Sequence, residues 1–410
     1  MKLKKSQRQS WILVLITLLV VLVGFVYNPS GQFSDIRPFY GMRYSMGDHP
    51  WPFTEYLQPG ATSAVPPIEY PALTGLIIWI LTFFVPETVN ATMNYFYLSC
   101  FLHGLLFVCL VLLVRRLSNP HLTYLLILSP AVITSLNRNW DVWVMVPTVA
   151  SILLFEQKRY SLSALVLGIA ISTKFFPIVL LLPITIFFLR NRKIIKLVKF
   201  YSITGSIWLV VNVPVALVNF EGWSYFYRLS FNRGLGDGSV FTIPGKFGFF
   251  ISFGSGAYFS LNLLLFLSLT FFLWRYPQNL EISQSAFLAV TAFTFFGKQY
   301  SMQYVLWLAP LAVIAIATIT KRYQAKAVWG FLLWQGFEIV FHHAYYQNLL
   351  ARVLESRGAP MINFWSDFEY GIAAVLRYVA FLIFLGTFLK GLSQSRILLL
   401  KKHRTGNAKK

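Results

Sequence analysis

The chain has 410 residues, of which 57% are hydrophobic and only 12% are charged, and its mean hydropathy is +0.62. So few charged side chains cannot cover a water-soluble globule of this size, so we exclude a soluble protein and expect a polytopic membrane protein. In a soluble protein the net charge of +21 would suggest a nucleic-acid partner. Here the basic residues lie between apolar runs and at both ends, which excludes nucleic acid and indicates anionic membrane lipids instead.

The apolar segments predict helices, because backbone polar groups that face lipid must be paired within the segment. They are residues 11–27, 71–86, 93–114, 121–136, 140–155, 161–173, 175–189, 195–218, 256–274, 283–297, 303–319, 327–343 and 368–390. Basic residues precede the first segment but no small-residue cleavage site follows it, so we expect a retained helix with a cytoplasmic amino terminus. Residues 391–410 are predicted to form a basic cytoplasmic tail after a single multi-pass domain of residues 1–390.

Clusters of basic residues mark the predicted cytoplasmic ends of the helices. They are Lys158 and Arg159; Arg190, Arg192, Lys193, Lys196 and Lys199; Arg275; Lys321, Arg322 and Lys326; and Lys401, Lys402, Arg404, Lys409 and Lys410. With both termini inside, the number of crossings is even. We expect about 12, with one further short or re-entrant helix, which is residues 71–86 or alternatively residues 121–136. Both alternatives put the intervals around residues 139–141, 174, 220–246, 298–301 and 345–367 on the outer side.

A long polar interval, residues 28–70, follows the first apolar segment and is too long for a simple connection. It contains Asp35 and Arg37 near its start and Glu69 and Tyr70 at its end. Each has an ordinary interpretation, because an aspartate just after a helix is commonly a turn or cap residue, Arg37 can pair with it, and Glu69 can simply end the loop. We therefore treat this first extracytoplasmic loop as a candidate active-site segment that needs further support.

Two polar elements lie at the same predicted outer boundary. The first is NRNWD, with Arg138, Asn139 and Asp141, where Asp141 is either an active-site residue or the cap of the next helix. The second is Lys174 in GIAISTKFFPIVLLLP, and a charge at membrane depth costs roughly 2.5–3.5 kcal/mol. Lys174 therefore lies either at a break between two helices, facing a cavity, or at the end of a short helix from which it snorkels to the headgroups.

Further outer-side cations can hold a phosphate, although each one alone can equally belong to a solvated loop. Arg228 and Arg233 lie in the interval 220–246, and Lys298 and Gln299 lie in GKQYSMQYVLW. Late in the chain, Glu338 and Arg377 are predicted to form a structural ion pair rather than a metal site with His342 and His343, because adjacent helical histidines point in different directions. No nucleotide-binding or metal-binding motif is found, so we expect no cofactor and no metal.

The order of the motifs resembles that of a known group. SDIRPFYG, IEYPALTG, NRNWD, GIAISTKFFPIVLLLP, VNVPVALVNFEGWSYFYRLSFNRG and GKQYSMQYVLWLAPL are similar to motifs of GT-C superfamily integral-membrane glycosyltransferases, and most of all to those of family 87, over roughly residues 10–320. That family includes polyprenyl-phosphate-mannose-dependent mannosyltransferases. The resemblance implies a GT-C-type helical bundle in the plasma membrane. It also implies transfer of a sugar with inversion, from a polyprenyl-phosphate donor to a glycolipid or glycan acceptor on the outer face.

The resemblance also implies roles for particular residues. Asp35 matches the acidic general base of the first outer loop, and cations such as Lys174 would stabilise the phosphate of the donor. The residues expected to bind substrate are Arg37, Glu69, Tyr70, Arg138, Asn139, Asp141, Lys174, Arg228, Arg233, Lys298 and Gln299. Many relatives carry an Asp-x-Asp motif in this loop, whereas here Ile36 and Arg37 follow Asp35, so we expect no metal. Asp48 is a less favoured substitute base.

Two other functions compete with the enzyme. A secondary transporter or flippase of lipid-linked sugars also has buried charges, but such proteins often show two related halves with interrupted helices, and none is visible here. A scaffold for envelope assembly would not need Lys174 at membrane depth. The sequence therefore favours the glycosyltransferase.

Overall fold

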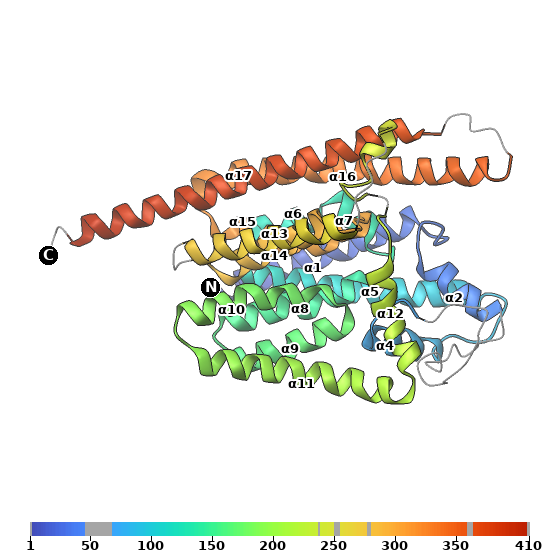
Figure 1. Ribbon diagram of the computed structural model, residues 1–410, viewed down its shortest axis with the longest axis horizontal. Helices are drawn as coiled ribbons and strands as arrows, with labels where there is room; N and C mark the ends of the chain where they lie inside the picture. Colours follow the sequence, from blue (N-terminus) through green and yellow to red (C-terminus); the bar gives the residue numbers. More distant parts are fainter. Residues whose placement is uncertain are drawn as a thin grey trace.

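The structure is a computed structural model that describes residues 2–45, 68–236, 238–249, 255–276, 280–358 and 364–407. Every regular element in this part of the chain is helical, as the sequence predicts (Figure 1). Residues 46–67, which include Asp48 and much of the first outer loop, lie outside the described residues.

The first half of the described chain follows the predicted segments closely, except that residues 36–45 of the predicted loop 28–70 form a helix. Its helices are α1 (Lys2–Tyr27), α2 (Ile36–Ser45), α4 (Ala72–Thr82), α5 (Ala91–Leu117), α6 (Pro120–Ile127), α7 (Pro130–Ser135), α8 (Asp141–Glu156) and α9 (Tyr160–Thr173). The segment 121–136 forms two helices instead of one. Ser129 accepts a hydrogen bond from the N–H of Val132 and Pro130 takes the first helical position, which starts a new helix there.

The second half contains more helix than the sequence predicts. Its helices are η1 (Phe176–Leu180), α10 (Leu181–Arg190), α11 (Ile194–Val218), α12 (Phe220–Asn232), η2 (Pro244–Phe247), α13 (Ser255–Arg275), α14 (Ile282–Phe295), η3 (Met302–Tyr304), α15 (Val305–Thr318), α16 (Lys321–Glu355) and α17 (Asp367–Asn407). The expected outer loop 220–246 includes α12 and η2. In addition, α16 extends well past the predicted end at residue 343, and α17 continues through most of the expected tail.

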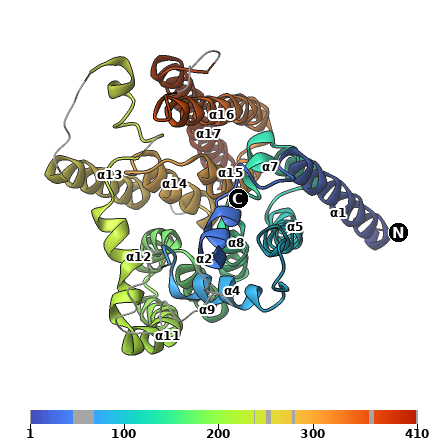
Figure 2. The same cartoon turned by 90° about the vertical axis from the view of Figure 1, so that its right-hand side faces the viewer.

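The helices run roughly along one common direction, with α2, α4 and α12 at one end of the molecule and both chain termini toward the other (Figures 1 and 2). Within the described residues, four helices are long and apolar enough to cross a membrane: Gln7–Tyr27, Ala91–Leu117, Ile194–Val218 and Asp367–Gln394. Shorter apolar helices accompany them. At 11 residues, α4 is about 16 Å long, about half the thickness of a hydrocarbon core. The protein is thus a helical membrane protein.

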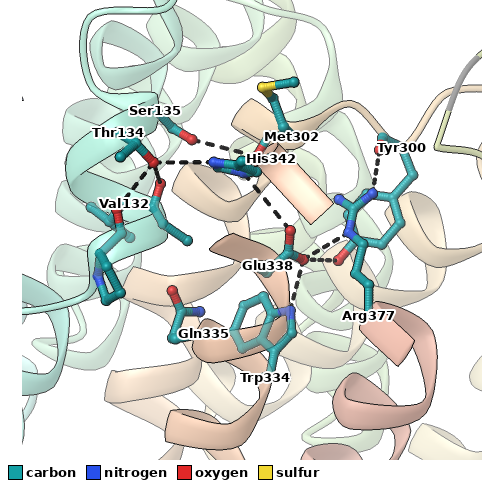
Figure 3. A network of polar contacts seen from close by, with 12 residues as sticks. Val132, Thr134, Ser135, Tyr300, Met302, Trp334, Gln335, Glu338, His342 and Arg377 are labelled. Carbon is teal, nitrogen blue, oxygen red and sulfur yellow. Dashed lines mark hydrogen bonds and ion pairs between the residues drawn. The ribbon is translucent and has the colours of Figure 1, made fainter. Parts of the chain in front are cut away.

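A buried ion pair joins α16 to α17, as predicted (Figure 3). Oε1 of Glu338 accepts hydrogen bonds from Nε of Arg377 at 2.9 Å and from Nε1 of Trp334 at 2.8 Å. The guanidinium of Arg377 lies over the rings of Tyr300 and Phe341, at 3.6 and 4.2 Å from their centroids. Because both charged side chains are fully buried, their mutual pairing and the aromatic rings hold the two long helices in one register.

Candidate active site

Asp35 lies between the end of α1 and the start of α2, at the end of the molecule that carries α4 and α12. Its backbone N–H donates to the carbonyl oxygen of Arg138 at 2.7 Å, and Oγ of Ser34 donates to the same oxygen at 3.1 Å. Oγ of Ser34 also accepts from the N–H of Ile36, which opens α2. The start of the polar interval 28–70 is therefore fixed by backbone contacts to the NRNWD segment.

The side chains of the same two segments form an ion pair. Oδ1 of Asp35 lies 3.5 Å from Nη2 of Arg138, with the aspartate 48% exposed and the arginine 11% exposed. Nη1 of Arg138 donates to the carbonyl oxygen of Phe33 at 3.2 Å and to the hydroxyl of Tyr346, and the guanidinium lies 5.2 Å from the centroid of that tyrosine ring. Arg138 is held from several sides, so it presents a fixed positive charge to Asp35.

The surroundings of Asp35 make its carboxyl a stronger base than usual. Desolvation by the surrounding protein is the largest effect and raises the pKa above its ordinary value of 3.8, while Arg138 opposes this rise. The charges of Asp141, Lys174 and Glu69 act on Asp35 as well, so these groups lie close enough to influence it. Asp35 therefore does not point away into solvent but belongs to a cluster of charges.

Asp141 and Lys174 form the second pair, which lies deeper in the protein. Oδ1 of Asp141 accepts a hydrogen bond from Nζ of Lys174; the aspartate is fully buried and the lysine is 19% exposed. Asn139 accepts a hydrogen bond from the N–H of Asp141 at 3.0 Å, whereas the cap position of α8 belongs to Trp140 and has no side-chain bond. The carboxylate of Asp141 thus pairs with Lys174 and does not cap its own helix.

Lys174 lies at a break between helices, which is one part of the first of its two predicted interpretations. α9 ends at Thr173, Lys174 is extended, and η1 begins at Phe176. Its ammonium group lies 5.0 Å from the ring centroid of Trp307 and 5.7 Å from that of Tyr70. These aromatic faces and the carboxylate of Asp141 hold the cation within the protein.

Glu69 and Arg233 form the third pair, at the surface. Nη2 of Arg233 donates to Oε2 of Glu69 at 3.1 Å, with the two side chains 48% and 43% exposed. Tyr70, the next residue, packs edge-on against Trp140 at 5.1 Å between ring centroids. Burial raises the pKa of Tyr70 well above its usual range, and the charge of Asp35 raises it further. The Tyr70 phenol therefore stays protonated among the three carboxylates.

A cavity of about 280 Å³ opens beside Asp35 and Arg138. The remaining lining residues are Gln299, Ser301, Met302, Gln303, Phe341 and Tyr345. The wall 299–303 is anchored on the Glu338–Arg377 pair, because Nη1 of Arg377 donates to the carbonyl oxygen of Tyr300 at 2.8 Å (Figure 3). Nε2 of Gln299 donates to the carbonyl oxygen of Gly234, and Nζ of Lys298 donates to that of Phe231, each at 3.0 Å. The cavity is therefore a built recess and not a gap between mobile loops.

Three predicted residues are not brought into contact with the three pairs. One is Lys298, whose ammonium group contacts the carbonyl oxygen of Phe231 and the rings of Phe231 and Tyr258. The other two are arginines. Nη1 of Arg37 donates to the carbonyl oxygen of Ser30 at 2.6 Å, and Nη2 of Arg228 donates to that of Glu221 at 3.0 Å. Within the described residues, no contact joins either arginine to Asp35, Asp141 or Glu69. The alternative that Arg37 pairs with Asp35 is thus replaced by the pair between Asp35 and Arg138.

The sequence interpretation missed several aromatic residues of the site. Tyr345 and Tyr346 fall in the interval 345–367 that was expected to be an outer loop, but they lie on α16. The hydroxyl of Tyr346 donates to the carbonyl oxygen of Phe33 at 3.0 Å. Trp307, under Lys174, stacks between Tyr304 and Phe176. The only signal available was the pair of adjacent tyrosines at the predicted outer boundary.

Comparison with known proteins identifies the family of the chain. The sequence profile of glycosyltransferase family 87 matches residues 69–297, which include Glu69, Asp141, Lys174 and Arg233 but not Asp35. No curated protein matches the chain. Among solved structures, the crystal structure of ArnT from Cupriavidus metallidurans bound to undecaprenyl phosphate is similar with a TM-score of 0.46 and 15% identity, over 92% of this chain and 77% of that one. The family match covers more than half of the sequence and confirms the resemblance drawn from the motifs: the protein belongs to glycosyltransferase family 87.

Proposed function

We propose that the protein is a mannosyltransferase that uses a polyprenyl-phosphate donor and an outer-face glycolipid or glycan acceptor, and that it transfers the sugar with inversion. The observation that carries this proposal is the meeting of three carboxylate–cation pairs at one end of the bundle. They are Asp35 with Arg138, Asp141 with Lys174, and Glu69 with Arg233. The donor class and the sugar follow from the family resemblance, and the side chains supply groups suited to that chemistry.

Asp35 is the proposed general base. Its carboxylate is half exposed on the cavity, and its raised pKa favours proton transfer from an acceptor hydroxyl. As that oxygen attacks the anomeric carbon, its proton passes to Asp35 and the bond from the anomeric carbon to the phosphate oxygen breaks. A single displacement of this kind inverts the anomeric configuration. General base catalysis contributes about 10²–10⁴-fold in rate.

Arg233 and Lys174 are the proposed partners of the donor phosphate. The pair between Arg233 and Glu69 is exposed, and such pairs contribute about 0–1 kcal/mol, so a phosphate can replace the carboxylate at little cost. The pair between Lys174 and Asp141 is buried and costly to separate. An ammonium group has three N–H donors, so Lys174 can keep Asp141 and still donate to a phosphate oxygen. Both cations then stabilise the charge that develops on the leaving phosphate.

Asp141 has a positioning role in this proposal. Its Oδ1 orients the ammonium group of Lys174, and among the described residues no hydrogen bond reaches its buried Oδ2. An unpaired buried carboxylate oxygen is costly and favours a donor from a bound ligand. We assign that donor to a sugar hydroxyl, which would place the transferred sugar between Lys174 and Asp35.

Asp35→Asn tests the proposal directly. Membranes that contain the variant are incubated with radiolabelled polyprenyl-phosphate mannose, and label in the glycolipid and glycan fractions is counted. We expect transfer to fall by about 10²-fold or more with normal expression and insertion, because the amide cannot accept the proton. The matched control is Asp367→Asn, which removes an exposed carboxylate bound to Lys246 and leaves the three pairs intact.

The same assay separates the parts of the proposal. Retained transfer in Asp35→Asn removes Asp35 from the mechanism. If the wild-type protein transfers label from another polyprenyl-phosphate sugar but not from polyprenyl-phosphate mannose, the family assignment stands and the proposed specificity for mannose is wrong.

A further inference from the structure

A second cavity lies at the other end of the helices that build the active site. It has a volume of about 370 Å³ and is lined by Lys158, Arg159, Tyr160, Ser161, Leu162, Lys196, Lys199 and Phe200. It sits between the start of α9 and the start of α11. Because α9 has 14 residues, this cavity lies about 21 Å along the helix axis from Lys174. It is therefore separate from the active-site cavity.

The cavity carries four positive charges and no negative one. Lys158 and Arg159 come from the turn between α8 and α9, and Lys196 and Lys199 are three residues apart on one face of α11. Among the described residues, none of these four side chains forms an ion pair. The carboxylate nearest in sequence, Glu156, accepts a hydrogen bond from the N–H of Ser283 instead. All four side chains are exposed, so water screens their repulsion, but together they give the recess a positive potential that attracts an anion.

Backbone donors point to the same ligand. The N-terminus of α9 has no side-chain cap, because its cap residue Arg159 makes no side-chain hydrogen bond to the helix. The first backbone hydrogen bond of the helix runs from the N–H of Ser163 to the carbonyl oxygen of Arg159. Tyr160, Ser161 and Leu162 form the first turn of the helix, whose N–H groups have no intrahelical partner, and all three line the cavity, where the helix dipole adds positive potential. A phosphate group, with several acceptor oxygens, fits both the charges and the donors.

The turn that supplies Lys158 retains a lysine where glycine is usual. Lys158 has φ of 61°, and the N–H groups of Lys158 and Arg159 bond back to the carbonyl oxygens of Phe155 and Leu154. This pattern is a Schellman motif, whose left-handed position normally favours glycine. Arg192, at the end of α10, has φ of 54° in the same pattern. Basic side chains occupy both positions, although glycine would relieve the backbone strain there.

The cavity has an aromatic floor around Tyr160 and exposed apolar residues on α11 at its rim, a combination that favours a lipid. The ring of Tyr160 packs against those of Phe155 and Phe188, and Nζ of Lys196 lies 5.5 Å from its centroid, so the floor is rigid. On α11, Ile195 and Val198 are exposed next to the lysines, where acyl chains can cover them. The charge pattern of the sequence predicts that this end faces the cytoplasm, where anionic headgroups lie.

We propose that this basic cavity (Lys158, Arg159, Lys196, Lys199) binds a phosphate ester, and that its source is the headgroup of an anionic phospholipid in the cytoplasmic leaflet. The site holds the start of α9 against the start of α11 from the face opposite the chemistry. A soluble phosphate compound has the same recognition chemistry and is the alternative source. This proposal does not depend on the transferase mechanism.

Native mass spectrometry of the full-length protein in neutral detergent tests the proposal, with phosphatidylglycerol as the probe. We expect Lys196→Gln/Lys199→Gln to weaken binding by about tenfold or more, since each basic side chain near a headgroup contributes about 1 kcal/mol. Lys199→Gln alone should show a smaller loss and serves if the double variant does not fold. The control is Lys321→Gln/Arg322→Gln, which removes two exposed charges at the same predicted face but away from the cavity.

The outcomes are distinct. Selective loss in the cavity variants, with phosphatidylcholine bound equally weakly by all proteins, supports the headgroup site. Equal loss in the cavity and control variants, or no loss in either, overturns it. Inorganic phosphate and glycerol 3-phosphate form a second arm. If millimolar concentrations of either displace the lipid and bind alone with the same dependence on Lys196 and Lys199, the phosphate site stands and its lipid source is wrong.

Discussion

The protein contains two buried ion pairs that are built very differently. Glu338 and Arg377 are both fully buried, and the arginine lies between two aromatic rings and donates to the carbonyl oxygen of Tyr300 (Figure 3). Asp141 is equally buried, but its partner Lys174 lies at a helix break and remains 19% exposed. The first pair uses the stronger and more rigid fork of an arginine, whereas the second uses a flexible ammonium group with donors to spare.

The difference distinguishes an ion pair with a structural role from one with a proposed role in substrate binding. The pair between α16 and α17 is closed to ligands, yet it holds the segment that forms one wall of the active-site cavity. In the pair between Asp141 and Lys174 the lysine side chain is still 19% exposed, and the proposed function uses it to bind the donor phosphate. Breaking the pair of Glu338 with Arg377 should therefore lower stability. Replacing both members of the Asp141–Lys174 pair by uncharged residues should instead lower activity.

The largest effect is expected from Arg377→Gln, which leaves Glu338 charged and unpaired in the interior. Such a loss destabilises a protein by about 3–5 kcal/mol. The thermal midpoint of unfolding in detergent should fall sharply. It is measured as the temperature at which half of the monodisperse gel-filtration peak is lost. Glu69→Gln, which breaks the pair with Arg233 that is exposed on both sides, is the control and should cost about 0–1 kcal/mol. Equal midpoints for the two variants would show that the buried pair has no special role in stability.

Lys174 is tested by a pair of variants. Lys174→Met alone leaves Asp141 buried and unpaired, so we expect losses of both stability and transfer. In Lys174→Met/Asp141→Asn no charge is left without a partner, so the thermal midpoint should return close to that of the wild type. Transfer should stay about 10²-fold lower, because the phosphate has lost a cation. A double variant with normal transfer would show that the pair is structural, like that of Glu338 and Arg377.

Arg233→Gln should have a smaller effect that is confined to donor binding. The exposed pair with Glu69 contributes little to stability, so the free energy of unfolding should change by less than about 1 kcal/mol and the thermal midpoint only slightly. The KM for the donor should rise about tenfold, since a charge-assisted hydrogen bond contributes about 1.5–3 kcal/mol. Arg228→Gln should raise it less, and Arg275→Gln, at the other end of the bundle, is the control. An unchanged KM in Arg233→Gln would leave Lys174 alone as the phosphate ligand.

The pH dependence of transfer gives the finest test. Asp35 acts as a base only when deprotonated, and its pKa is raised, so kcat/KM should fall with decreasing pH at a value above the ordinary 3.8. Arg138 holds that pKa down. Arg138→Gln should therefore raise the pKa further and move the acid limb to higher pH. A limb that stays in place would mean that a group other than Asp35 controls the rate.

Much of the helical pattern could be predicted, because apolar periodicity and helix-ending signals are local. The pair of Glu338 with Arg377 was predicted, and the break at Lys174 was one of two interpretations, for the same reason: an ionisable side chain inside an apolar segment needs a partner or a cavity. The partners of Asp35 and Glu69 were not predicted. Arg138 and Arg233 lie more than 100 residues along the chain from Asp35 and Glu69, respectively. No local sequence pattern specifies which of several arginines forms the pair. The helical state of Tyr345 was missed because α16 continues far beyond its apolar stretch.

The hydrogen bond from Tyr346 to the carbonyl oxygen of Phe33 links residues 313 positions apart. The same tyrosine hydroxyl accepts from Arg138, so the pocket around Asp35 lacks its final support until α16 has left the ribosome and entered the bilayer. Nascent chains that stop short of this helix would carry Asp35 without the tyrosine that aligns Arg138. The pocket around Asp35 is therefore completed only when synthesis has passed Tyr346.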